Sequence, residues 1–294
     1  MNRQPNFIYI GTSKAGSTWL FDVLSRHPDV YVTPAKGLYF FDHHSSKGWS
    51  WYLDHFSDAT SERIVGEISH SYLYSEIACE RIAAMNPDIK LMVCLREPID
   101  RAFSMYLDGI RNGKWTGTFE ERYKDTPAIV DEGCYARHLE TYLNRFSRDQ
   151  IHVTLFDDLR WDPKSYAQGV FEALEVPPMS LDSKLLTKVM PASLPRNKTI
   201  VHIAKRTSEV CRRLKWKKLR GRVKRSRLIR SLLFRKLREA EKASISPEVL
   251  AELKVRFQPD VERLDELLGM QLCQRWGYTS RSKITPLKDR HPIS

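Results

Sequence analysis

The segment at residues 11–18 carries residue types that can hold an anion. It reads Gly-Thr-Ser-Lys-Ala-Gly-Ser-Thr and follows a short apolar run at residues 7–10. Small residues let several backbone N–H groups face one point, and a helix that starts at the end of such a loop adds the positive potential of its N-terminus. Lys14 lies inside this loop. The pattern predicts a site for a phosphate-like anion; a tight strand-to-helix turn without a ligand is the alternative.

The position of the lysine distinguishes this loop from a nucleotide-binding P-loop. Gly11 and Gly16 have the spacing of that loop, but Ser17 stands directly after the second glycine, where a P-loop has its lysine. The loop therefore indicates an anion site without deciding which anion it binds.

Arg96 and Ser104 form a second group that can hold a phosphate. The apolar run at residues 89–95 ends in Arg96, where a P-loop kinase usually has an acid for Mg²⁺, and Ser104 follows about two helical turns later. Bidentate arginine contacts and a hydroxyl suit a second phosphate. Ligands of open α/β sheets bind at the carboxyl ends of strands, so we expect both groups to line one crevice. An ion pair of Arg96 with Glu97, Asp100 or another nearby carboxylate is the alternative.

Strands and helices that alternate along the chain must position these residues. Short apolar runs rich in β-branched residues predict strands at residues 7–10, 30–32, 89–95 and 151–156. Helical patterns follow the first loop as far as Pro28, start again at Pro98, and cover residues 75–85, 134–146, 163–175 and 247–268. Residues 42–56 read as a polar, aromatic stretch. We expect one α/β domain over residues 1–294, with a P-loop-like, mostly parallel sheet flanked by helices on both faces.

Composition limits the class of protein. The 294 residues are 41% hydrophobic and 29% charged, and the mean hydropathy of −0.46 excludes a disordered chain and an integral membrane protein. The five cysteines are widely spaced, so neither a disulfide framework nor a cysteine zinc site is expected. The first apolar run is short for the core of a signal peptide. We expect a cytoplasmic protein that is peripheral to the membrane at most.

The net charge of +12 is concentrated in one segment. Residues 205–238 hold 16 basic residues and one acid, a local balance of +15, which leaves the rest of the chain at −3. Leucines and other apolar residues alternate with these charges, so we expect a basic helical elaboration over about residues 196–245. It suits an anionic membrane surface or a polyanionic acceptor, whereas nucleic acid is a less favoured partner. A solvated helical hairpin packed on the domain is the alternative.

Two motifs together resemble the sulfotransferases that use 3′-phosphoadenosine 5′-phosphosulfate (PAPS). Residues 12–20 are similar to their 5′-phosphosulfate loop, and residues 95–106 to their 3′-phosphate motif. The heparan sulfate sulfotransferases and bacterial carbohydrate-type relatives are more similar, because further segments match them in order. These segments are residues 36–42, 66–73, 133–139 and 151–158. The resemblance is clear over residues 6–178 and loose over 247–276.

The resemblance implies a role for each matching residue. Glu67 would take the proton of the acceptor as it attacks sulfur in line, and Lys14 would neutralise the departing nucleotide, adenosine 3′,5′-bisphosphate (PAP). Positioning and a lysine would then replace a metal. The residues expected to bind the nucleotide are Ser13, Lys14, Ala15, Gly16, Ser17, Thr18, Trp19, Arg96, Ser104, Tyr135 and Arg196.

The chain departs from the family pattern on the acceptor side. Gly37 and Ile68 stand where these enzymes often have glutamate and lysine. Lys36 is kept and is expected to touch the sulfuryl group or the acceptor, and His70 is expected to share or assume the role of base. The heparan enzymes also carry a disulfide-flanked basic loop over the nucleotide, for which Arg196 is the candidate replacement. A solvated Lys36 and a structural His70 are the alternatives.

The expected reaction is sulfuryl transfer to a hydroxyl, less favourably an amine, of a carbohydrate, a glycolipid or a glycosylated natural product. Two other functions remain open from the sequence. One is a nucleotide-dependent kinase, which would need Mg²⁺ and ATP. The other is a basic membrane or nucleic-acid adaptor without catalysis on a P-loop-like fold.

Overall fold

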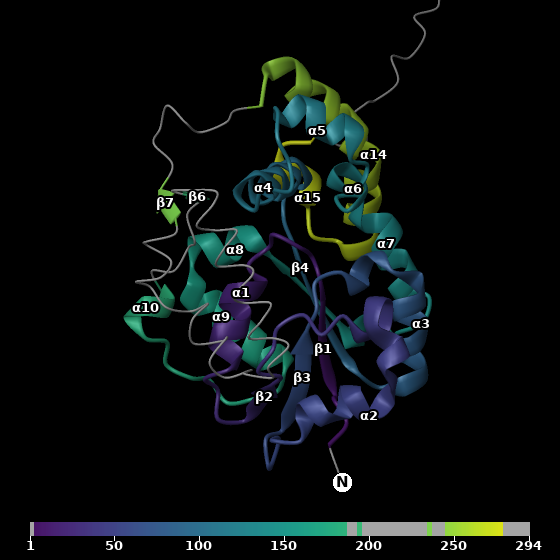
Figure 1. Ribbon diagram of the computed structural model, residues 1–294, viewed down its shortest axis with the longest axis vertical. Helices are drawn as coiled ribbons and strands as arrows, with labels where there is room; N and C mark the ends of the chain where they lie inside the picture. Colours follow the sequence, from purple (N-terminus) through teal and green to yellow (C-terminus); the bar gives the residue numbers. More distant parts are fainter. Residues whose placement is uncertain (1–2, 187–192, 196–233, 237–244, 279–294) are drawn as a thin grey trace, which may run out of the picture.

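The computed structural model describes residues 3–186, 193–195, 234–236 and 245–278. Its centre is a parallel sheet of five strands in the order β2-β3-β1-β4-β5 (Figure 1). The strands are β1 (Phe7–Gly11), β2 (Val30–Val32), β3 (Ile64–Ile68), β4 (Lys90–Leu95) and β5 (Ile151–Leu155).

Helices cover both faces of this sheet. Both faces are apolar, because successive side chains of β1 point into two different cores. Ile8 and Ile10 belong to a core shared with α3 (Glu76–Met85), α7 (Tyr135–Leu143) and α14 (Pro247–Leu268). Phe7 and Tyr9 face the other way. They pack in a core with α1 (Ser17–Leu24), α9 (Pro163–Ala173) and α10 (Ser183–Leu186).

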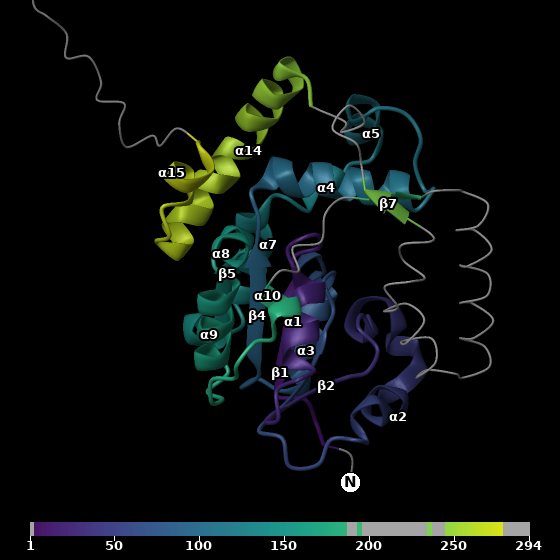
Figure 2. The same ribbon diagram turned by 90° about the vertical axis from the view of Figure 1, so that its left-hand side faces the viewer.

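A helical layer lies over the carboxyl edge of the sheet. Its long member is α4 (Pro98–Arg111), which crosses above the ends of β1 and β4 (Figure 2). This layer also includes α14 and the shorter helices α5 (Phe119–Asp125), α6 (Ala128–Asp131) and α15 (Leu272–Trp276) (Figure 1). The loop at residues 12–16 and Arg96 both follow strands at this edge.

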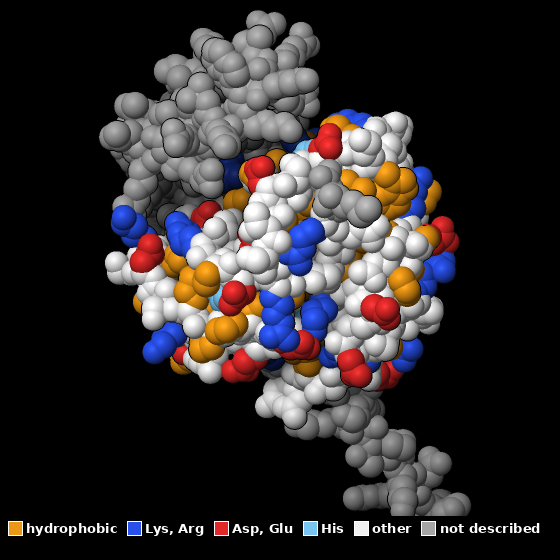
Figure 3. Space-filling model, turned by 90° about the horizontal axis from the view of Figure 1, so that it is seen from below, with side chains coloured by type: hydrophobic (Ala, Val, Ile, Leu, Met, Phe, Trp, Pro, Cys, Tyr) orange, Lys and Arg blue, Asp and Glu red, His pale blue; other side chains and the backbone are white. Residues whose placement is uncertain are grey.

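The surface at the opposite edge of the sheet shows a mixture of side-chain types. Seen from below, its surface carries positive and negative side chains interspersed with single apolar ones (Figure 3). No helix among the described residues is long and apolar enough to cross a bilayer.

Most predicted elements are confirmed. The four predicted strands are β1, β2, β4 and β5, and the predicted helices at 163–175 and 247–268 are α9 and α14. The helix that Pro98 was expected to start is α4, and the helix predicted at 134–146 is the shorter α7. The fold is α/β with a P-loop-like parallel sheet, as predicted.

Two regions differ from the sequence prediction. Residues 42–56 form short helical turns around α2 (Gly48–Leu53), because their aromatic rings pack together; Tyr52 stacks 4.5 Å from Phe40. Strand β3 was missed, since a glycine and a glutamate interrupt its apolar run. Gly66 is required there, as a Cβ would lie 2.2 Å from the Phe7 carbonyl oxygen on the neighbouring strand.

The predicted basic segment at 196–245 lies largely outside the described residues. Its described part, β7 (Phe234–Lys236), is a strand that pairs antiparallel with β6 (Ser193–Pro195), so the predicted helical structure is absent at these three residues.

Candidate active site

The loop between β1 and α1 is shaped to expose its backbone. Lys14 and Gly16 both have a positive φ, of 67° and 82°, which turns the chain sharply before α1 begins at Ser17. A side chain at position 16 would meet Leu159, since its Cβ would lie 2.5 Å from Leu159 Cδ2. The first N–H groups of a helix have no partner within the helix. The loop therefore offers backbone donors at the carboxyl edge of the sheet.

Lys36 comes from the segment after β2 and closes over this loop. Its ammonium donates hydrogen bonds of 2.9 Å to Ser17 Oγ and 2.8 Å to Thr18 Oγ1. Burial, together with the nearby charge of Lys14, lowers the pKa of Lys36 to about 8. The prediction that Lys36 lies at the site is consistent with this geometry, and it extends the set of cations around the loop.

Arg96, which follows β4, lies next to Lys14, which belongs to the loop after β1. The Lys14 ammonium lies 3.2 Å from Asp108 Oδ1 on α4. The Arg96 guanidinium donates a 3.1 Å hydrogen bond to the Lys14 carbonyl oxygen and lies 4.7 Å above the ring of Phe156. It also pairs with Asp100 at 3.6 Å. The ion pair expected as an alternative is thus present, and Arg96 still adjoins the loop.

One polar atom of Arg96 has no partner. Its Nε is buried and makes no hydrogen bond within the described part of the chain. A buried donor left without an acceptor costs free energy, which an acceptor on a bound ligand would recover. Ser104 is on α4, eight residues beyond Arg96 and half-buried.

Three predicted nucleotide ligands have other partners in this structure. Ser13 donates its hydroxyl to Glu132 Oε2 at 2.9 Å and its amide to the Tyr74 hydroxyl at 3.3 Å. Tyr135 is buried and donates its hydroxyl to the Arg96 carbonyl oxygen at 2.8 Å. Trp19 packs in the core, where its indole N–H reaches the Leu185 carbonyl oxygen at 2.9 Å. These side chains support the loop and the end of β4.

Two further predicted ligands are Ala15 and Arg196. Ala15 lies in the loop with its methyl group buried. Arg196 lies outside the described residues.

Glu67 is a fully buried carboxyl group. It lies in β3 with 0% of its surface exposed. Its carboxylate accepts hydrogen bonds from the hydroxyls of Tyr52 at 3.1 Å, Tyr72 at 3.0 Å and Ser69 at 2.6 Å. Burial raises the pKa of Glu67 to about 7, although the three hydroxyl donors act to lower it.

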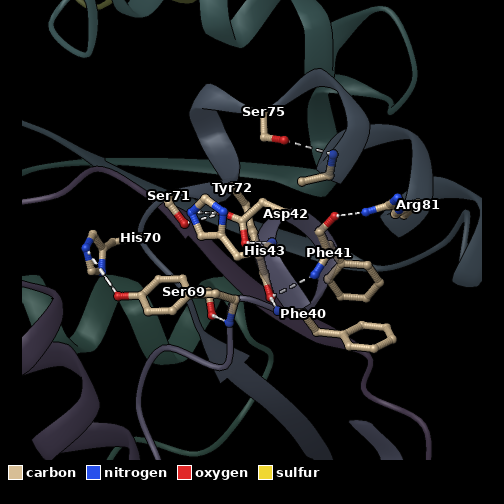
Figure 4. A network of polar contacts seen from close by, with 12 residues as sticks. Phe40, Phe41, Asp42, His43, Ser69, His70, Ser71, Tyr72, Ser75 and Arg81 are labelled. Carbon is tan, nitrogen blue, oxygen red and sulfur yellow. Dashed lines mark hydrogen bonds and ion pairs between the residues drawn. The ribbon is translucent and has the colours of Figure 1, made fainter. Parts of the chain in front are cut away.

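His70 follows β3 in a turn, so it is not on one helical face with Glu67. Its Nδ1 lies 3.1 Å from the Tyr39 hydroxyl, away from the pair that Ser71 and Asp42 form (Figure 4). Burial, and then the charges of Lys36 and Lys14, lower the pKa of His70 to about 4. His70 is therefore a neutral imidazole beside the lysines of the loop.

Several residues at the site were not found from the sequence. Asp108 pairs with Lys14, and Glu132 holds Ser13 together with the buried Arg101, which contacts it at 3.0 Å. Asp108 had a usable signal, since it stands four residues after Ser104 on the predicted helix. Glu132 had none, because it comes from an unpredicted connection after α6.

The comparisons with known proteins identify the family. A model of the sulfotransferase domain matches residues 4–222. The chain is a member of the sulfotransferase domain family. This confirms the resemblance drawn from the two phosphate-binding motifs.

Curated relatives of this sulfotransferase include two human enzymes. It is 34% identical over 168 residues to heparan sulfate glucosamine 3-O-sulfotransferase 3B1, a match that covers 54% of this chain and 43% of the relative. It is 34% identical over 188 residues to heparan sulfate glucosamine 3-O-sulfotransferase 5, covering 59% and 54%. The chain thus spans about half the length of these relatives.

A solved structure agrees with the fold. The sulfotransferase from Alicyclobacillus acidocaldarius superposes with a TM-score of 0.69 at 23% identity, over 94% of this chain and 99% of that chain. At this identity the likeness supports the architecture of the sulfotransferase.

Proposed function

We propose that this sulfotransferase moves a sulfuryl group from PAPS to a hydroxyl, less readily an amine, of a carbohydrate, a glycolipid or a glycosylated natural product. The observation that carries the proposal is that Lys36 and Arg96, from two separate parts of the chain, contact the segment between β1 and the start of α1, which itself carries Lys14.

The described residues fit a nucleotide with phosphates on both sides of its ribose. The backbone of residues 14–18, with Ser17 and Thr18, would hold the 5′-phosphosulfate, and Lys36 would add a charge to it. Arg96 would take the 3′-phosphate with Ser104. The contact of Arg96 with the Lys14 carbonyl oxygen supports this, because it places the guanidinium beside the loop.

Two groups would do the chemical work in the transfer. Lys14 would neutralise the negative charge that develops on the departing PAP. Glu67 would take the proton from the acceptor, and its pKa of about 7 suits a general base near neutral pH. Its enclosure by Tyr52, Tyr72 and Ser69 requires this shell to open towards the acceptor; catalytic hydrogen bonds often form only in the complex.

His70 is the second candidate for the base, and a specific observation favours it. Its ring is less enclosed than Glu67, and its low pKa keeps it neutral and able to accept a proton at pH 7. Tyr39 would orient the ring through the contact at Nδ1.

The acceptor is proposed by analogy with the relatives. The two human relatives are named for heparan sulfate glucosamine. The acceptor of this chain is expected to be a glycan hydroxyl of that general kind, while Gly37 and Ile68 indicate that its contacts differ.

Ligand-induced stabilisation tests the donor. We expect PAP to raise the melting temperature at micromolar concentration, and ATP with Mg²⁺ to do so far less. The reverse order would favour the kinase and overturn the proposal. Mass spectrometry after incubation with PAPS and a panel of glycans should then show a sulfated product. If the wild type forms no sulfated product, and its binding to anionic partners survives both Lys14→Ala and Glu67→Ala, the non-catalytic adaptor would be favoured.

We further propose that the protein is cytoplasmic and touches anionic membranes through the basic segment at 205–238, which lies outside the described residues apart from β7. Neutralising Arg220, Arg222, Lys224 and Arg225 should reduce binding to vesicles that contain anionic lipid. Unchanged vesicle binding and activity in this variant would overturn the membrane proposal.

A further inference from the structure

One face of α4 presents carboxylates to the cations of the proposed donor site. Asp100, Ser104 and Asp108 are spaced by four residues and so share a face. Figure 2 shows α4 lying across the end of β1 and the start of α1, where the loop runs. Asp100 pairs with Arg96 at 3.6 Å, and Asp108 with Lys14 at 3.2 Å. Lys14 and Arg96, two of the cations expected to meet a phosphate, are therefore each paired with an acid of α4.

The pair at Asp108 is the stronger of the two. The side chains of Asp108 and Lys14 are 32% and 25% exposed, whereas that of Asp100 is 56% exposed. Arg111 contacts the same carboxylate of Asp108 from one turn later on α4. Although burial works to raise the pKa of Asp108, the charges of Lys14 and Arg111 outweigh it and hold this pKa below its usual value. Asp108 is thus an ionised group between two cations.

Lys36 provides the contrast within the same loop. Its ammonium donates hydrogen bonds to the neutral hydroxyls of Ser17 and Thr18. An anion that enters the loop can add to Lys36 without displacing a charge. At Lys14 the anion meets an ammonium that is already paired with the carboxylate of Asp108. The anion and this carboxylate carry like charges, so they repel each other when both lie beside Lys14.

We propose that Asp108 is a positioning residue that acts as the internal counter-ion of Lys14, and that an anion bound at the loop must displace it. The proposal rests on the proposed function, since this anion would be the 5′-phosphosulfate of the donor or the 5′-phosphate of PAP. Asp108 holds the ammonium of Lys14 at the loop before the donor arrives. It also recaptures that ammonium when PAP leaves, so it weakens product binding.

This role has a signature that a structural role lacks. Loss of a merely structural contact would loosen the loop and weaken the binding of PAP. Loss of a competing anion strengthens it, because Asn keeps the size of the side chain and removes the repulsion. We expect Asp108→Asn to bind PAP about tenfold more tightly, which is about 1.4 kcal/mol. The KM for the donor should fall with the Kd, and kcat should fall where release of PAP limits turnover.

Titration calorimetry with the full chain and PAP tests this. The conservative variant Asp108→Glu keeps the charge and should bind PAP within threefold of the wild type. Asp125→Asn is the matched control, because Asp125 pairs with Arg122 three residues away on α5; it should change the Kd less than twofold. The gain in Asp108→Asn should shrink at high salt, since partly exposed charges are screened. An unchanged or weaker affinity of Asp108→Asn would overturn the proposal.

A second probe separates this proposal from the donor assignment. Inorganic pyrophosphate can occupy the loop without a nucleoside. If the wild type binds pyrophosphate but not PAP, and Asp108→Asn binds pyrophosphate more tightly, the counter-ion role stands and the donor assignment fails. If PAP binds the wild type and Asp108→Asn equally, the donor assignment stands and the counter-ion role fails. Absence of binding of either probe to every variant would overturn both.

Discussion

The ammonium of Lys36 donates a 2.8 Å hydrogen bond to the hydroxyl of Thr18, in the first turn of α1. This contact ties the segment after β2 to the end of the helix that carries the positive dipole. A cation and a helix N-terminus thus face the same place, and both favour an anion there.

Lys36→Met should weaken the binding of PAP by tenfold or more while leaving the fold intact. Met keeps the apolar stem of the side chain and removes the charge, so the loss is electrostatic. Calorimetry with PAP measures it, and Lys47→Met is the control, because Lys47 lies over the ring of Trp51. An affinity of Lys36→Met equal to that of Lys47→Met would refute the role of Lys36.

The affinity for PAP should also fall as the pH rises above about 8. The pKa of Lys36 is lowered to about 8 by burial, so the free protein loses this charge above that pH. Binding then requires the uptake of a proton, and the logarithm of Kd should rise with pH with a slope approaching one. In Lys36→Met this rise should be absent. An equal rise of the Kd with pH in the wild type and in Lys36→Met would assign the proton to another group.

Arg96→Lys should lower the preference for a 3′-phosphate. A lysine cannot reproduce the planar, bidentate contact of arginine or its stacking on Phe156. We expect the Kd of PAP to rise at least tenfold and the Kd of adenosine 5′-phosphate to change little. Comparing the two nucleotides by calorimetry measures this directly. Equal losses for both would place Arg96 at the 5′ side instead.

The sequence predicted most of the sheet because apolar runs are local features, and the two groups expected to bind phosphate could be located next to these runs. An apolar run predicts β4, and the arginine that ends it stands at the edge where ligands bind. Strand β3 could not be found in this way. Its glycine is required by the approach of Phe7 on β1, which is a contact between residues far apart in the chain.

The partners of the predicted residues were even harder to predict. Ser13, in the loop, is held by Glu132, more than a hundred residues later. Tyr135 was expected at the nucleotide, and its hydroxyl donates to the backbone of Arg96, a partner that the sequence did not indicate. A motif shows which residue types gather at a site, whereas tertiary packing decides which of them face the ligand and which hold the others.

Arg101→Met should destabilise the protein strongly. Arg101 is fully buried, and its loss would leave the carboxylate of Glu132 without its cation, at a cost of about 3–5 kcal/mol in the free energy of unfolding. Urea unfolding measures it. Arg263→Met removes an exposed cation that pairs with Glu140 and should cost less than about 1 kcal/mol. A loss of similar size in both variants would show that the buried pair contributes no more than a surface one.

The pH dependence of catalysis should decide between Glu67 and His70 as the base. Each must be deprotonated to accept the proton of the acceptor, so kcat/KM falls below the pKa of whichever group acts. The two pKa values differ, because burial raises that of Glu67 to about 7 while burial and two lysines lower that of His70 to about 4. A limb near pH 7 therefore points to Glu67.

We expect that limb in the wild type and in His70→Gln. In Glu67→Gln this limb should be absent. The kcat of this variant should also be at least a hundredfold lower, since general acid–base catalysis contributes a factor of about 10²–10⁴. The pH dependence of the stability of the wild type and of Glu67→Gln gives an independent check. The pKa of Glu67 is higher in the folded than in the unfolded chain, so the wild type loses stability as the pH rises from about 4.5 to 7, and Glu67→Gln should not. An active Glu67→Gln whose kcat/KM stays level down to pH 5 would assign the proton transfer to His70.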